Sequence, residues 1–130
     1  MQTVTAQDIQ GSWLLESFEI EGVDKKIALW GENAHGLLIY AESGHMSVSI
    51  NRKLAKKSAV EAENIFDSIL FYSGTYRVDG STITHQVTNA SNPSRIGREM
   101  LRYAELAGDL LTLASPQESF GRAILKWRKA

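Results

Sequence analysis

The chain has 130 residues, enough for one domain with a core of its own, and we expect a single domain over residues 1–130. A formal net charge of −1 offers no strong field for nucleic acid or an anionic membrane, so neither is an expected partner. Cysteine is absent, which excludes disulfides, a thiolate nucleophile and cysteine metal ligands. The first residues lack the pattern of a secretory signal, and no apolar run is long enough to span a bilayer; we therefore expect a cytoplasmic location.

Short runs rich in β-forming residues alternate with turn signals along the whole chain, which is typical of an antiparallel sandwich or barrel. A helical turn over residues 5–10 precedes the first run. The predicted strands cover residues 13–20, 36–41, 46–51, 72–78, 82–88, 100–106, 110–115 and 123–128, with a weaker run at 27–30. None of these strands contains proline, as the interior of a hydrogen-bonded sheet requires.

The turn between strands 36–41 and 46–51 leaves two registers open. A two-residue loop at Ser43–Gly44 would direct Leu37 and Ile39 inward, whereas a three-residue loop ending in a bulge at Gly44 would direct Leu38 and Tyr40 inward. The orientation of Tyr40 therefore stays undecided at this point.

One segment departs from the strand pattern and predicts a helix over residues 59–70. Ser58 and Glu61 have the spacing of a capping box, in which each side chain accepts a hydrogen bond from a backbone N–H of the other. Apolar residues then recur at helical spacing up to Leu70. We expect this helix to cover an open end of the sheet.

Asp79–Gly80 predicts a tight type I′ hairpin loop between two strands with a clear apolar face. This register turns His85 inward, places it opposite Gly74, and sets Tyr72 and Tyr76 on its diagonals. A glycine in the middle of a strand often marks a place where another group must fit.

Gly108–Asp109 predicts a second tight loop, of type II′, that pairs Leu106 with Leu111 and Ala104 with Leu113. Met100 and Arg102 share the inward face of this hairpin. Two interpretations of Arg102 remain open: it reaches water at the mouth of the barrel, or it binds the anionic end of a ligand.

Several segments together resemble the lipocalin-like domain family, whose members are calycin-type small β-barrels. They are Gly11-Ser12-Trp13 at the first strand, Gly36-Leu37-Leu38-Ile39-Tyr40, Tyr72-Ser73-Gly74-Thr75-Tyr76, and Leu125-Lys126-Trp127-Arg128 at the last strand. The resemblance covers nearly the whole chain and implies an all-β, antiparallel up-and-down barrel of about eight strands with a ligand cavity. It also implies that a basic residue of the last strand packs over Trp13, with Arg128 as the first choice and Lys126 as the second.

No sequence motif indicates a metal or a cofactor, and we expect neither. His35, His45 and His85 lack the spacing of a metal site, and the chain has no nucleophile elbow and no phosphate-binding glycine loop. The candidate ligand-binding residues are the inward polar groups together with two adaptable methionines. They are Tyr72, Tyr76, His85, Arg102, Met46 and Met100.

The leading functional hypothesis is binding of a small, largely apolar ligand, with an anionic or enolic end, inside the barrel. A second hypothesis is a cofactor-independent cyclase, isomerase or hydratase in which His85 and Tyr76 transfer protons. A third is a barrel filled by its own side chains and without a ligand. The sequence names neither the ligand nor the oligomeric state.

Overall fold

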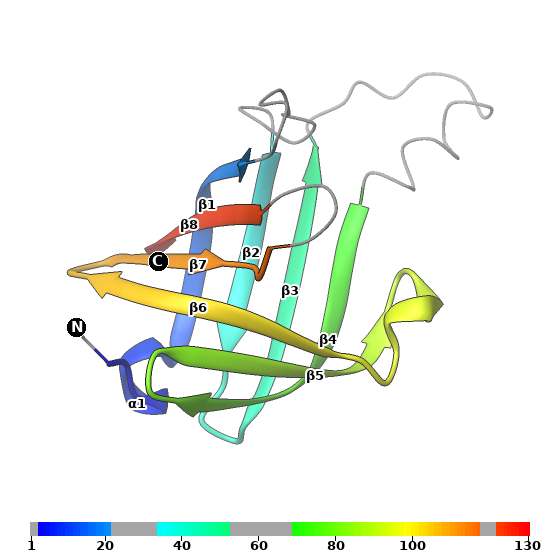
Figure 1. Cartoon of the computed structure of the whole chain (residues 1–130), viewed down its shortest axis with the longest axis horizontal. Coiled ribbons are helices and arrows are strands. Elements are labelled where there is room, and N and C mark those ends of the chain that lie inside the picture. The colour runs from blue at the N-terminus through cyan, green and yellow to red at the C-terminus, as the bar shows by residue number, and fades with distance from the viewer. Residues whose placement is uncertain (1–2, 22–33, 53–68, 118–121) are drawn as a thin grey trace.

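The computed structural model describes residues 3–21, 34–52, 69–117 and 122–130. Eight antiparallel strands follow one another in chain order and close into a barrel, because β1 pairs with β2 on one side and with β8 on the other (Figure 1). The strands are β1 (Gly11–Glu21), β2 (Ala34–Tyr40), β3 (His45–Arg52), β4 (Ile69–Asp79), β5 (Thr82–Ala90), β6 (Glu99–Ala107), β7 (Leu110–Ala114) and β8 (Arg122–Lys129). The predicted up-and-down barrel and its eight main strands are confirmed.

Two short helical elements accompany the barrel: α1 (Ala6–Ile9) before β1, and the 3-10 turn η1 (Pro93–Arg95) between β5 and β6. Thr5 and Asp8 form a capping box at the start of α1, in which each side chain accepts from the other's backbone N–H. Within the described ranges, no helix is long and apolar enough to cross a membrane.

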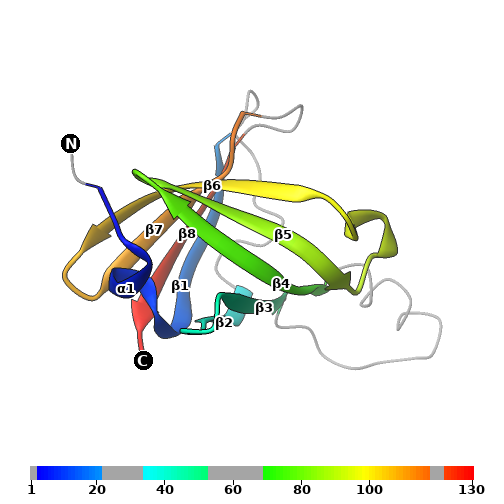
Figure 2. The same ribbon diagram turned by 90° about the horizontal axis from the view of Figure 1, so that it is seen from below.

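The segment around α1 closes one end of the barrel (Figure 2). Ile9 is fully buried, and its carbonyl accepts a 2.9 Å hydrogen bond from Trp13 Nε1. The Val4 backbone N–H donates to the Gly80 carbonyl, and Lys129 Nζ donates to the Gln10 carbonyl. The segment is therefore tied both to the β4–β5 turn and to the end of β8.

The basic residue over Trp13 is Lys129, whose Nζ lies 4.7 Å from the centroid of the indole. The family expectation of a cation from the last strand is confirmed, but both named choices, Arg128 and Lys126, are wrong. Side chains alternate along a strand, and the register pairs Trp13 with Lys129, so Arg128 points outward and pairs with Glu16 at 2.8 Å.

The β2–β3 hairpin has the three-residue loop. Ala41 N–H donates to the His45 carbonyl, Gly44 has a φ of +91°, and Tyr40 pairs with Met46. Leu38 and Tyr40 are each 1% exposed, which decides the orientation of Tyr40: it points inward.

The β4–β5 hairpin has the predicted faces but a shifted register. Asp79 pairs with Thr82, so the loop is Gly80–Ser81, and His85 lies opposite Tyr76 and not opposite Gly74. The physical reason is that Gly80, with a φ of +64°, occupies the first loop position, where tight hairpins need positive φ and glycine alone has it at little cost. A shift of two residues leaves every side chain on its predicted face.

Gly74 accommodates backbone, and it does not open a space for a ligand. The pairing shifts between Ser73 and Gly74, and the bulge brings the β5 chain so close that an added Cβ would collide with the Gln86 carbonyl oxygen. The prediction that Gly74 leaves room beside His85 is therefore wrong.

The β6–β7 hairpin confirms its predicted register, with Leu106 paired to Leu111 and Ala104 to Leu113. Ser58 and most of the predicted helix over 59–70 lie outside the described residues, as does the weak strand at 27–30. The last two residues of that helix prediction are wrong, because residues 69–70 begin β4. The β-branched and aromatic residues that follow extend the strand backward beyond its expected start.

Candidate functional site

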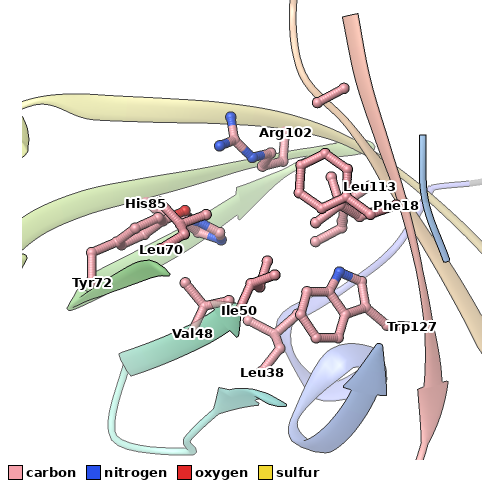
Figure 3. A pocket seen from close by; sticks show the side chains of 12 residues that line it. Phe18, Leu38, Val48, Ile50, Leu70, Tyr72, His85, Arg102, Leu113 and Trp127 are labelled. Carbon is pink, nitrogen blue, oxygen red and sulfur yellow. The ribbon is translucent and has the colours of Figure 1, made fainter. Parts of the chain in front are cut away.

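A cavity of about 70 Å³ lies inside the barrel, and residues from all eight strands line it (Figure 3). Its lining combines apolar side chains with a few polar ones. The lining residues are Phe18, Leu38, Val48, Ile50, Leu70, Tyr72, His85, Arg102, Leu113, Ala123, Leu125 and Trp127. Strand alternation explains the set, since it collects inward positions from β1, β2, β3, β4, β5, β6, β7 and β8.

The polar centre of the cavity wall is a chain of three side chains, which we call the tyrosine–histidine–tyrosine chain. His85 Nε2 lies 2.6 Å from the Tyr40 hydroxyl, and His85 Nδ1 lies 2.6 Å from the Tyr72 hydroxyl. All three residues are at most 2% exposed. Both ring nitrogens of His85 are thus engaged, which holds the imidazole in one orientation.

Burial governs the protonation of this chain. It lowers the pKa of His85 from 6.5 to about 3, and the charge of Arg102 adds to this effect. Burial also raises the pKa of Tyr40 well above its usual value and raises that of Tyr72, where the charge of Arg102 opposes the shift. The imidazole and both phenols are therefore neutral at physiological pH.

Arg102 reaches the cavity from β6, near His85 and Tyr72 (Figure 3). One of its guanidinium nitrogens donates to the Leu101 carbonyl at 2.8 Å, and the residue is half-buried. It forms no ion pair with any residue in the described part of the chain. A positive charge with part of its surface in contact with water, and with no carboxylate beside it, is available to an anionic group.

The structure brings three of the six predicted ligand-binding residues to the cavity: Tyr72, His85 and Arg102. Met46 and Met100 are not among the lining residues, although Met46 is buried in the core.

Tyr76, the sixth predicted residue, is also absent from the lining. Its hydroxyl donates to the Ala41 carbonyl at 2.8 Å, and its ring packs 4.8 Å from that of Tyr40. Tyr76 thus packs against the Tyr40 ring and helps to fix its position. The hydrogen bonds of His85 go to Tyr40 and Tyr72, and not to Tyr76. The catalytic role considered for His85 with Tyr76 stays a prediction.

Two contributors with polar groups, Tyr40 and Trp127, have no role assigned from the sequence. The inward orientation of Tyr40 depends on the length of the β2–β3 loop. The glycine at position 44, which suits the positive φ of a three-residue loop, was the signal in the sequence that favours this length. Trp127 could have been found from the alternation of β8, in which Leu125 and Trp127 are buried while the neighbouring Arg128 is exposed.

No group of three or more His, Asp or Glu side chains suited to a metal ion occurs among residues 3–21, 34–52, 69–117 and 122–130. The polar atoms at the cavity are instead phenol, imidazole, guanidinium and indole groups. Such groups recognise organic molecules by hydrogen bonding.

Comparison with solved structures places the fold among small β-barrels. A redesigned β-barrel, b11L5F_LGL, covers 97% of this chain and 95% of its own with a TM-score of 0.54 at 11% identity. A mutant of the fluorescent protein UnaG (TM-score 0.49, covering 97% and 99%) and a mutant of the REP1-NXSQ fatty acid transporter (0.46, covering 95% and 99%) are also 11% identical. At such identities the similarity concerns the fold alone. The conclusion about the fold rests on the redesigned barrel, which has the TM-score above 0.5.

No curated protein matches the chain. A family model described as a lipocalin-like domain matches residues 10–130, which is nearly the whole chain and every strand of the barrel. The chain therefore belongs to the lipocalin-like domain family.

Proposed function

We propose that the barrel interior binds a small, largely apolar molecule whose polar end is a hydrogen-bond acceptor, such as a carboxylate or an enolate. The observation that carries this proposal is the presence of both Tyr72 and Arg102 in the lining of the cavity, where no carboxylate belongs to the described lining. Binding sites of this kind combine an apolar surface with a few polar groups that fix the orientation of the ligand.

Counting donors and acceptors explains why the cavity favours an acceptor. A neutral imidazole has one N–H and one lone pair, so one tyrosine donates to His85 and the other accepts from it. Within the described residues, the enclosed Tyr40 hydroxyl has His85 Nε2 as its partner, and its proton must go there. His85 Nδ1–H then donates to the Tyr72 oxygen, and the Tyr72 O–H is left to donate to a ligand.

The positive charge of Arg102 strengthens the preference for an acceptor and makes an anionic acceptor the best partner. A guanidinium forms shorter and stronger hydrogen bonds with an anion than a neutral donor does, and it opposes the entry of a cation. The Arg102 guanidinium offers donors only, and the Tyr72 hydroxyl, whose oxygen already accepts from His85, offers its proton. An acid or enolate satisfies both groups.

The cavity volume limits the size of the ligand. The space of about 70 Å³ is well below the roughly 300–1,000 Å³ of pockets for drug-sized molecules. We therefore propose a ligand with a short acyl chain or a small ring, whose apolar part lies against Val48, Ile50 and Leu113.

The test compares two four-carbon probes of opposite charge, butanoate and butylammonium, by calorimetric titration. We expect butanoate to bind and butylammonium not to bind. Arg102→Ala should weaken butanoate binding by roughly ten- to hundred-fold, the effect of losing a hydrogen bond to a charged group. The exposed Arg98, which is not among the lining residues, provides the matched control Arg98→Ala. Equal binding of both probes, or equal losses in the two variants, would contradict the proposal.

A further inference from the structure

Trp127 presents a buried donor that nothing in the described structure uses. The residue lies in the interior of β8, paired with Leu15 and Leu111, and is 1% exposed. Its indole lines the cavity, and no described residue accepts a hydrogen bond from its Nε1–H. Figure 3 shows the nitrogen edge of this indole turned toward the side of the cavity where Phe18 and Leu113 lie.

A second buried indole among the described residues shows what such a donor ordinarily has. Trp13, also 1% exposed, donates from Nε1 to the Ile9 carbonyl at 2.9 Å. Buried tryptophan N–H groups usually have a partner, because an unpaired donor has lost its hydrogen bond to water without a replacement. An unpaired N–H at a cavity surface therefore marks a position for an acceptor inside that cavity.

We propose that Trp127 determines the specificity of the site by donating to a second acceptor, an oxygen on the apolar part of the ligand. This rests on the proposed function, in which the acidic end of the ligand binds Tyr72 and Arg102. Trp127 lies across the cavity from these two residues (Figure 3). The preferred ligand is then an oxo acid, with a carboxylate at one end and a carbonyl oxygen farther along a short apolar chain.

The chemistry of the indole makes this contact selective. Its N–H donates and cannot accept, so it distinguishes a carbonyl from a methyl or methylene group of the same size. A site with a buried donor rejects the analogue that lacks the acceptor, because the donor stays unpaired in that complex.

The test uses two short acids of nearly the same shape: 4-oxopentanoate, which has a ketone, and 4-methylpentanoate, which has a methyl group in place of the ketone oxygen. Both are titrated into protein labelled with 15N at the indole nitrogens. We expect 4-oxopentanoate to bind roughly ten-fold more tightly and to shift the Trp127 indole N–H resonance. The Trp13 indole N–H, whose partner is the Ile9 carbonyl, should not move and serves as the internal control.

Trp127→Phe assigns the resonance by its disappearance and should abolish the difference in affinity between the two acids. If that variant does not fold, the titration of the native protein decides alone. Equal affinities of the native protein for both acids, with no shift of the Trp127 resonance, would overturn the role of Trp127 and leave the proposed function standing. Failure of both acids to bind would contradict the proposed function, and the further inference with it.

Discussion

Replacement of His85 by glutamine should remove a specific part of the acid sensitivity of the barrel. Burial lowers the pKa of His85 to about 3 in the folded protein, whereas the side chain has its ordinary value of 6.5 once it is exposed by unfolding. Between these two pH values the unfolded chain binds a proton that the folded protein does not. The stabilisation is thus complete above pH 6.5 and is lost as the pH falls.

The magnitude follows from the two pKa values. Over the two pH units between pH 6.5 and pH 4.5, the loss is about 2 kcal/mol of unfolding free energy. This loss of free energy hardly depends on the pKa of His85 in the folded protein, because pH 4.5 still lies above that pKa. Glutamine can donate to one tyrosine and accept from the other, so His85→Gln keeps a polar link in the tyrosine–histidine–tyrosine chain but removes the titrating group.

The assay is urea denaturation of the native protein and of His85→Gln at several pH values from 4.5 to 6.5. Carboxylates contribute equally to both proteins, so the difference between the two slopes isolates His85. Parallel slopes for the native protein and His85→Gln would refute the reasoning.

Three further substitutions test parts of the fold. Tyr40→Phe removes the partner of the buried histidine Nε2, and chemical denaturation should show a loss of about 1–3 kcal/mol; an unchanged unfolding free energy would contradict the hydrogen bond. Lys129→Met should cost about 0.5–1 kcal/mol through loss of its cation–π contact and Lys126→Met less, and the reverse order would place the wrong lysine over the indole. Gly74→Ala should lower the melting temperature far more than the neighbouring Ser73→Ala, because its Cβ collides with backbone; equal effects would argue against the bulge.

The barrel was predictable from sequence because its evidence is local. Alternating strands and the Gly108–Asp109 turn each depend on neighbouring residues, and the β6–β7 register follows from them. Side-chain faces are also robust, since a register error of two residues keeps the face. The sequence therefore predicts correctly that His85 points inward, although it predicts the wrong cross-strand neighbour.

The candidate site was only partly predictable because its partners come from strands that are distant in sequence. The bond between Tyr40 and His85 joins residues 45 positions apart, and it depends on the loop length of one hairpin and the register of another. The close approach of the β5 backbone to Gly74 could not be predicted, because the sequence of one strand does not indicate how near a second strand lies. The choice among the cations of β8 required the β1–β8 pairing, which closes the barrel between the two ends of the chain.

The location of the ligand is tested most directly by intermolecular nuclear Overhauser effects between 13C-labelled butanoate and the methyl groups of the protein. If butanoate binds inside the barrel, its chain should show contacts to Val48, Ile50 and Leu113, which line the cavity. Contacts confined to methyl groups on the outer surface, such as those of the exposed Leu14 and Leu37, would contradict this location, because they would place the bound acid outside the barrel.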